Sequence, residues 1–129
     1  MTGQAGEFLA ASVLQRSFRA IAFPNIPAPY DLIVESYAGK LLKCQVKTCD
    51  KPKTITGNEY WRFNTRSRAG RYLDTEIDFL ALVILPRRLV YFLSVNDIKA
   101  DCVYLNTESV ERSIEAETLT KVLGEYINE

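Results

Sequence analysis

The segment from Lys40 to Thr48 alternates between apolar and polar side chains, and this pattern constrains the fold more than any other feature of the chain. Successive side chains of a β-strand point to opposite faces, so the pattern predicts one apolar face and one polar face. The apolar face carries Leu42, Cys44 and Val46, and the polar face carries Lys43, Gln45 and Lys47. Because Ala38-Gly39 is typical of a turn, we expect Tyr30 to Ser36 to form the preceding strand of a hairpin. The polar face must then meet solvent or a ligand.

The rest of the chain predicts a mixed architecture. Residues 3–20 are expected to form an amphipathic helix, whose apolar face carries Phe8, Ala11, Leu14 and Phe18. Asp78 to Leu85 and Leu89 to Val95 are strongly apolar, which predicts two central strands covered on both faces. The order of a helix, several strands and a final helix predicts an α/β or α+β fold around a mixed sheet.

The remaining expectations are local. Residues 49–58 predict a loop or the tip of a hairpin, 60–64 a strand, and 66–71 a basic loop or a short helix start. Asn96 is expected to cap a helical turn that reaches Lys99. Residues 102–105 predict a last strand, followed by a helix from Thr107 or Glu108 to about Tyr126.

Length and composition limit the class of protein. The 129 residues predict a single domain over 1–129, and 47% hydrophobic with 25% charged residues is ordinary for a globular protein. No segment approaches the roughly 20 apolar residues of a membrane span, and no signal pattern opens the chain, so we expect a cytoplasmic protein. Three cysteines without a CxxC pair do not predict a disulfide framework or a zinc site. The absence of histidine excludes Ser-His-Asp and Cys-His catalysis.

The zero net charge hides an uneven distribution of charge. From Lys40 to Arg71 there are nine Lys and Arg residues against two acids, whereas from Asp97 to the C-terminus there are eight acids against three bases. A local concentration of basic residues attracts phosphate backbones even when the whole chain is neutral. The middle of the chain is therefore the expected nucleic-acid contact.

The predicted hairpin would bring an acid, an amide and an amine to one point. Mg²⁺ (magnesium) prefers oxygen ligands and takes one or two protein carboxylates, so Asp31 is the expected direct ligand. The Gln45 amide oxygen and the Val46 backbone carbonyl are further candidate ligands. Lys47 is placed to position or polarise an attacking water. Glu7 is expected on the apolar side of the first helix, where a carboxylate needs a partner such as a metal-water cluster. Together these groups predict phosphodiester hydrolysis.

These residues resemble the motif of the PD-(D/E)XK nuclease superfamily. The matching positions are Tyr30-Asp31, Gln45-Val46-Lys47 and Glu7. The sequence is most similar to the cyanobacterial group I intron homing endonucleases of this class, which are small and also carry glutamine at the third motif position. The resemblance covers about residues 3–95. It implies an α/β, restriction-endonuclease-like core in which a mixed β-sheet is flanked by helices.

The resemblance also implies a function. It indicates a site-specific endonuclease of the homing type that depends on Mg²⁺, with Mn²⁺ as an alternative cofactor, and assigns catalytic roles to Glu7, Asp31, Gln45 and Lys47. Pro29 is displaced by one residue from the Pro-Asp pair of the family. Gln45 replaces the usual acid, and the lost negative charge predicts weaker metal affinity.

The expected partner is double-stranded DNA. The candidate DNA-binding residues interleave with aromatic side chains and are Lys51, Lys53, Arg62, Arg66, Arg68 and Arg71. Because one active site cuts one strand, we expect a homo-oligomer, either a dimer or a tetramer. Two alternatives remain open: a Holliday-junction resolvase of the same fold, and a catalytically inactive DNA-binding module, which the glutamine at position 45 suggests.

Four of the selected residues also have a purely structural interpretation. Cys44 and Trp61 are typical of core positions, and Asp78 is typical of a structural residue at a strand end. Glu7 is an ordinary solvated or capping acid when taken alone. Their environments decide between these interpretations.

Overall fold

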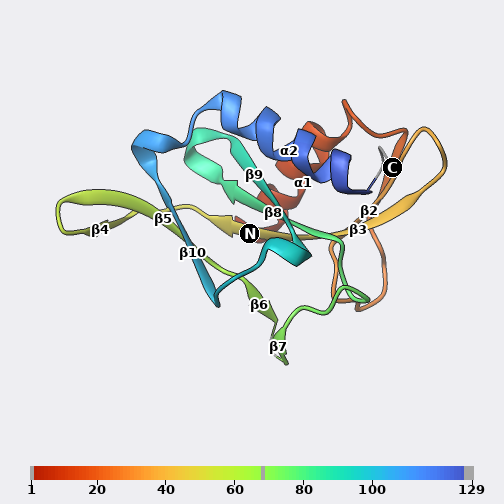
Figure 1. Cartoon of the computed structure of the whole chain (residues 1–129), viewed down its shortest axis with the longest axis horizontal. Coiled ribbons are helices and arrows are strands. Elements are labelled where there is room, and N and C mark those ends of the chain that lie inside the picture. Colours follow the sequence, from red (N-terminus) through yellow and green to blue (C-terminus); the bar gives the residue numbers. More distant parts are fainter. Residues whose placement is uncertain (1, 68, 127–129) are drawn as a thin grey trace.

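The structure of the protein is a computed structural model that describes residues 2–67 and 69–126. Its main sheet has five strands in the order β1-β2-β3-β8-β9 (Figure 1). These strands are β1 (Ala20–Ala22), β2 (Leu32–Glu35), β3 (Leu41–Cys49), β8 (Phe79–Ile84) and β9 (Leu89–Ser94). β3 and β8 are parallel, and the other neighbouring pairs are antiparallel. The sheet is therefore mixed, as the sequence predicts.

Both helices cover the same face of this sheet. α1 (Thr2–Leu14) and α2 (Arg112–Tyr126) lie on one side of it in Figure 1. Their apolar side chains share a buried cluster with the apolar face of the hairpin; the cluster includes Ala10, Val13, Leu14, Leu119, Val122, Leu32, Val34, Leu42, Cys44 and Val46. The expected flanking by helices thus holds on one face only. Neither helix has the length and apolar character needed to cross a membrane, among the residues described.

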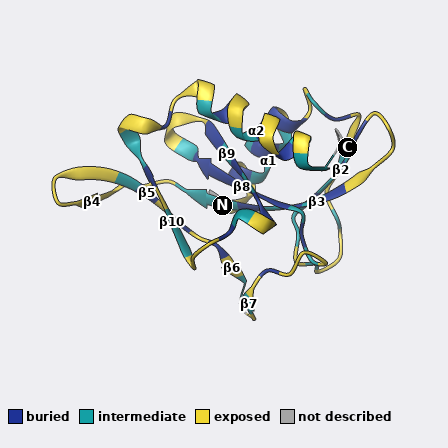
Figure 2. Cartoon of the chain, viewed as in Figure 1, coloured by how far each residue is buried: buried dark blue, intermediate teal, exposed yellow. Residues whose placement is uncertain are grey.

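A second sheet covers the opposite face. Its order is β10-β5-β4, formed by β4 (Lys53–Ile55), β5 (Asn58–Asn64) and β10 (Cys102–Asn106). Trp61, Phe63 and Leu105 share a second buried cluster with Leu80 and Leu82 of β8. Because β8 is covered on both faces, all of its residues are buried, as Figure 2 shows in dark blue. This explains its continuous apolar sequence.

A small hairpin follows β5 and projects from both sheets (Figure 1). It consists of β6 (Arg66–Ser67) and β7 (Gly70–Arg71), which pair antiparallel. A basic loop or a helix start was expected here, and the strand pairing shows that the helical alternative is wrong. Gly70 has a φ of 115°, which L-residues rarely adopt, so its position favours the tight return over a helix.

The first helix is shorter than predicted, and Phe8 of its expected apolar face is exposed. It ends at Leu14, and the chain leaves it through a turn in which Ser17 N–H donates to Leu14 O at 3.0 Å. Phe8 is 57% exposed and packs edge-on against Phe23, with ring centroids 5.7 Å apart. Leu14 and Phe18 are buried as predicted, and the buried face also includes Gly6, Ala10 and Val13. These small residues let the helix approach the sheet closely, so Phe8 is turned outward.

β9 is an edge strand, whereas the sequence predicted a central one. α2 covers this edge with side chains: Glu115 Oε1 accepts from Val90 N–H at 2.9 Å, and Thr118 Oγ1 accepts from Phe92 N–H at 3.0 Å. An uncovered edge would offer these donors to another chain. The apolar sequence of β9 therefore reflects burial under a helix.

The cap of the turn after β9 and the start of the last helix also differ from the predictions. A 3-10 turn at Val95–Asp97 is capped by Ser94, whose Oγ accepts from Asn96 N–H, so Asn96 is not the cap. α2 begins at Arg112, after a separate 3-10 turn at Thr107–Ser109. The hairpin tip expected within 49–58 is confirmed by the pairing of β4 with β5.

Three structural interpretations are confirmed. Cys44 is fully buried and Trp61 is 3% exposed. Asp78 Oδ2 accepts a hydrogen bond of 2.8 Å from Lys43 N–H, so this carboxylate joins the start of β8 to β3. Asp78 is therefore a structural residue.

Candidate active site

The pairing of β2 with β3 places Asp31 beside Gln45. Leu32 pairs with Cys44, and Asp31 N–H donates to Cys44 O at 2.9 Å, which extends the pairing by one residue. Leu32 and Cys44 face the helices, so Asp31 and Gln45 face the opposite side. Lys47 follows Gln45 by two residues and shares that side. The convergence predicted from the alternating pattern is confirmed.

These three side chains line one cleft of about 560 Å³. Its wall is completed by the segment before β2, the end of β5, the β6–β7 hairpin and the residue that follows it. The additional lining residues are Ala28, Pro29, Asn64, Arg66, Ser67 and Tyr72. The cleft therefore lies between β3 and the β6–β7 hairpin, and it opens to solvent.

The Asp31 carboxylate is held by the backbone of β3. Its Oδ2 accepts a hydrogen bond of 3.0 Å from Val46 N–H. Burial raises the pKa of Asp31 above its ordinary value, while the Val46 hydrogen bond and the charge of Lys47 act in the opposite direction. Burial removes water from this carboxylate and destabilises its charged form, and a cation placed beside it would stabilise that form.

The Lys47 ammonium is held by the far wall of the cleft. Nζ donates to the carbonyl oxygen of Arg66 at 3.2 Å and lies 5.3 Å from the centre of the Tyr72 ring. Among the described residues, no ion pair within 4.0 Å joins Lys47 to Asp31. The charge of Lys47 therefore acts on Asp31 from across the cleft.

Glu7 is not among the residues that line the cleft; it lies on α1, where its charge interacts with that of Asp31. It is half-buried on α1, one residue after the position where the helix backbone meets Thr48 of β3. Burial raises the pKa of Glu7, and the negative charge of Asp31 raises it further. The charges of the two acids therefore interact. The sequence predicted that Glu7 joins Asp31 in one cluster, but the Glu7 side chain does not line the cleft.

The donor set fits a hard divalent cation. Asp31 Oδ1 has no hydrogen-bond donor among the described residues, and the Gln45 amide lines the same cleft. The Val46 side chain packs under the helices, so this residue could contribute only through its backbone. Among the described residues, no group of three or more His, Cys, Asp or Glu side chains is arranged to hold a metal ion. That sparse set suits Mg²⁺, which keeps several waters and uses few protein carboxylates.

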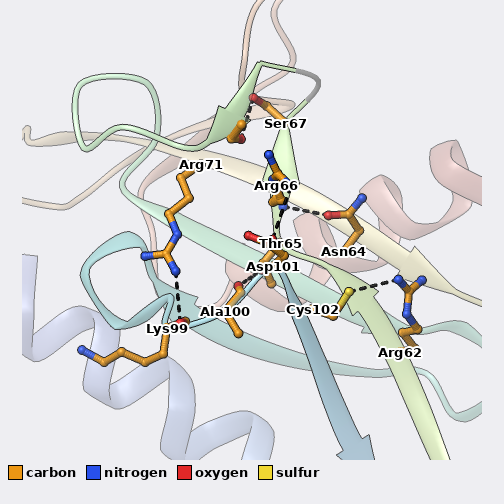
Figure 3. A network of polar contacts seen from close by, with 11 residues as sticks. Arg62, Asn64, Thr65, Arg66, Ser67, Arg71, Lys99, Ala100, Asp101 and Cys102 are labelled. Carbon is orange, nitrogen blue, oxygen red and sulfur yellow. Dashed lines mark hydrogen bonds and ion pairs between the residues drawn. The ribbon is translucent and has the colours of Figure 1, made fainter.

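The basic residues are distributed over and beyond the cleft. Arg66 lines it, whereas Lys51, Lys53, Arg62 and Arg71 are exposed outside it. Arg68 lies outside the described residues. Figure 3 shows Arg66 and Arg71 against the 99–101 turn: Arg66 Nη1 is 3.3 Å from Asp101 Oδ2, and Arg71 Nη2 donates to Lys99 O at 3.1 Å. These contacts fix the base of the hairpin to the turn before β10.

Arg62 projects from the outer face of β5. Its Nη2 donates to Cys102 Sγ at 3.0 Å, and a hydrogen bond with Tyr104 is the main reason that the pKa of Arg62 is raised. Trp61 and Phe63 alternate with it and face the core. The outer face of the second sheet is therefore polar and accessible.

Sequence reasoning missed Asn64, Ser67 and Tyr72 as residues of the cleft. The alternation of β5 could have placed Asn64 on the face of Arg62. Tyr72 carries no comparable signal, because its position depends on the packing of the β6–β7 hairpin. Asp101, which pairs with Arg66, was likewise not identifiable from its sequence context.

The fold and the cleft define an α/β protein in which a mixed sheet carries two helices on one face and a polar cleft on the other. The chain is similar over nearly its whole length to a solved structure, that of the bacterial homing endonuclease I-Ssp6803I. The TM-score is 0.72 at 23% sequence identity, and the match covers 99% of this chain and 96% of that chain. No family model matches the sequence, and no curated protein is significantly similar to it. At this identity the likeness establishes the fold.

Proposed function

We propose that the chain is a metal-dependent DNA endonuclease of the PD-(D/E)XK class that cuts double-stranded DNA at a specific site. The observation that carries this proposal is the convergence of Asp31, Gln45 and Lys47, from two neighbouring strands, on one open cleft. The likeness to a structure described as a bacterial homing endonuclease supports it. The exposed arginines around the cleft are consistent with a phosphate backbone as the partner.

Each residue has a distinct task in this proposal. Asp31, the Gln45 amide and the Val46 carbonyl would hold Mg²⁺ or Mn²⁺, which supplies the Lewis acidity that offsets phosphate charge and lowers the pKa of water. Lys47 donates hydrogen bonds to the attacking water and to a non-bridging phosphate oxygen, and its charge opposes the charge that develops there. Glu7 is half-buried and its charge interacts with Asp31, and in this proposal it orders water near that carboxylate. Arg66 holds the adjacent phosphate in the cleft.

A double-strand break requires more than one copy of this site. One cleft faces one phosphodiester, so we infer a homo-oligomer, a dimer or a tetramer, that presents two clefts to the two strands. Exposed apolar side chains at the β1 end, including Phe8, Phe23 and Ile26, are compatible with such an assembly. Sedimentation or light scattering with and without DNA measures the number of copies.

The test is cleavage of two substrates in parallel. Purified protein is incubated with Mg²⁺ and either a randomised duplex library or a synthetic four-way junction, and the ends are mapped. Cutting at one duplex sequence supports the proposal, whereas cutting of junctions regardless of sequence supports a resolvase. Binding of DNA without any nick, with Mg²⁺ or Mn²⁺, would establish an inactive module and overturn the proposal.

Matched variants identify the site responsible. Asp31→Asn and Lys47→Ala should each reduce cleavage by about 100-fold or more while DNA affinity changes little. Lys43→Ala is the control, because Lys43 lies on the same face of β3 but does not line the cleft. Equal losses in Lys43→Ala and Lys47→Ala would show that the measured activity does not depend on this cleft.

A further inference from the structure

The contacts of Lys47 raise a question about its position. Lysine and aspartate side chains on one face of adjacent strands can form a direct ion pair, and such a pair would occupy the carboxylate. Yet among the described residues Lys47 forms no ion pair with Asp31. Its ammonium is instead directed to the opposite wall, where it meets the Arg66 carbonyl and the Tyr72 ring.

We propose that Tyr72, together with the Arg66 carbonyl, is a positioning device that holds Lys47 away from Asp31 and so keeps the carboxylate open to a cation. The inference rests on the proposed endonuclease function. Tyr72 touches no reacting atom in this proposal. It acts through Lys47 alone.

The geometry of Tyr72 suits this role. The residue is buried and packs in the same cluster as Leu80 and Leu82, so its ring has little freedom to move. An ammonium within about 6 Å of a ring centre is attracted to the electron-rich face, and Lys47 Nζ lies at 5.3 Å. The ring therefore offers a fixed, uncharged partner for a flexible cation.

The Arg66 carbonyl sets the direction in which the Lys47 side chain points. An ammonium has three N–H donors, and the 3.2 Å bond to this carbonyl uses one of them. The carbonyl is set in turn by the base of the hairpin, where Arg66 N–H donates to Asn64 Oδ1 at 2.9 Å and Thr65 N–H donates to Asp101 O at 2.8 Å. At least one donor of Lys47 is left to face the substrate. The β6–β7 hairpin thus positions the Lys47 ammonium through the Arg66 carbonyl and also carries the Arg66 side chain.

The proposal predicts separate effects for the ring and the hydroxyl of Tyr72. Tyr72→Leu removes the ring, so Lys47 moves toward Asp31; the apparent Kd for Mg²⁺ should rise about three- to tenfold and kcat should fall about tenfold. The Kd for DNA, measured with Ca²⁺, should stay within about twofold. Tyr72→Phe keeps the ring and should behave as the wild type. Tyr91→Leu removes a partly buried tyrosine next to the same cluster, outside the cleft, and serves as the control.

A direct readout does not depend on cleavage. Lys47 Nζ lies over the Tyr72 ring, so the NMR signal of the adjacent ε-methylene protons should be shifted upfield by the ring current. Tyr72→Leu and Lys47→Ala should abolish that signal, and Tyr72→Phe should retain it. If the wild type never cuts DNA, the proposed function fails, while this signal and the Mg²⁺ titration still decide the position of Lys47.

Two results would overturn the inference. One is a Lys47 signal that is not shifted in the wild type, and the other is a Tyr72→Leu protein with unchanged Mg²⁺ affinity and kcat. If Tyr72→Leu does not fold, pentafluorophenylalanine at position 72 replaces it in the test, because that ring has similar shape and a reversed quadrupole. The same rise in the Kd for Mg²⁺ is expected from it, and wild-type affinity would contradict the proposal.

Discussion

Gly6 of α1 lies so close to Thr48 of β3 that a Cβ on Gly6 would stand 1.8 Å from Thr48 Oγ1. The helix backbone therefore rests directly on the strand that carries Gln45 and Lys47. This contact also sets the position of Glu7, the next residue along the helix. Packing of one glycine thus connects the helix to the candidate active site.

Gly6→Ala should displace α1 from the sheet. The added methyl group would overlap Thr48 Oγ1 and also stand 2.9 Å from Thr48 Cβ, so we expect a loss of about 1–3 kcal/mol of folding free energy, measured by urea denaturation. Gly124→Ala is the control, because a Cβ there meets nothing within 4 Å and helix propensity improves by up to about 1 kcal/mol. Adding Thr48→Ala to Gly6→Ala should restore part of the loss. A Gly6→Ala protein of wild-type stability would show that the helix is not in this contact.

The raised pKa of Asp31 predicts that the free energy of unfolding depends on pH. Because its pKa is above the ordinary value of 3.8, the folded protein holds this proton more tightly than the unfolded chain. Stability from this group is therefore present at acidic pH and is lost as the pH rises from 3.8 through the higher folded value. Asp31→Asn cannot ionise, so without divalent cations it should be more stable than the wild type at neutral pH. The difference should shrink on acidification, and thermal unfolding across this pH range measures it.

Divalent cations should make the wild type more stable than Asp31→Asn, which reverses their order of stability. Mg²⁺ at ten times its Kd should stabilise the wild type by about 1.4 kcal/mol, because it binds the folded state only. Asp31→Asn should gain much less, and EDTA should remove the gain. Equal stabilisation of both proteins would place the cation elsewhere on the molecule.

The convergence of the site residues was predictable because strand geometry is local. Alternation fixed which face of β3 carries Gln45 and Lys47, and the short turn before it fixed the antiparallel pairing with Asp31. The position of Glu7 was less predictable. It depends on how closely a helix of small residues approaches the sheet, and periodicity alone favoured the larger Phe8 for the buried face.

The opposite wall of the cleft was not predictable from local pattern. Tyr72 reaches Lys47 because the β6–β7 hairpin turns back over the end of β3, and that hairpin is held by Asp101 and Lys99 from a distant segment. Contacts between segments 25 or more residues apart leave no periodic signal in either segment. The same reason explains why the edge position of β9 was not predicted. Its apolar sequence is typical of a central strand, but here α2, a distant segment, covers the edge.

Glu115 should be a stability residue without a role at the cleft. It is buried, its Oε1 accepts from Val90 N–H at 2.9 Å, and its Oε2 lies 3.5 Å from Arg112 Nη1. Glu115→Ala leaves the strand donor unpaired and should cost about 1–3 kcal/mol in urea denaturation. Glu115→Gln keeps an acceptor and should cost less. The exposed Glu117→Ala is the control on the same helix, and any cleavage per folded molecule should be unchanged in all three.

The arginines around the cleft should contribute separately to DNA binding. Alanine at a residue that contacts phosphate lowers affinity for all sequences and reduces the slope of log K against log salt by about 0.9. We expect this for Arg66, whose partner Asp101 is exposed, so that their ion pair is weak enough to exchange for a phosphate. Arg62 lies on the outer face of β5, where a contact to a base edge would instead relax sequence preference and leave the slope unchanged.

Arg16→Ala is the matched control for this salt series. Arg16 lines a hollow between the two helices, on the face of the main sheet opposite the cleft. Fluorescence anisotropy with Ca²⁺ measures affinity without cleavage. If Arg16→Ala reduced the salt slope as much as Arg66→Ala, DNA would bind across the helices, and the cleft could not be the place where the backbone is held. An unchanged slope for Arg16 together with a reduced one for Arg66 places the phosphate next to Lys47.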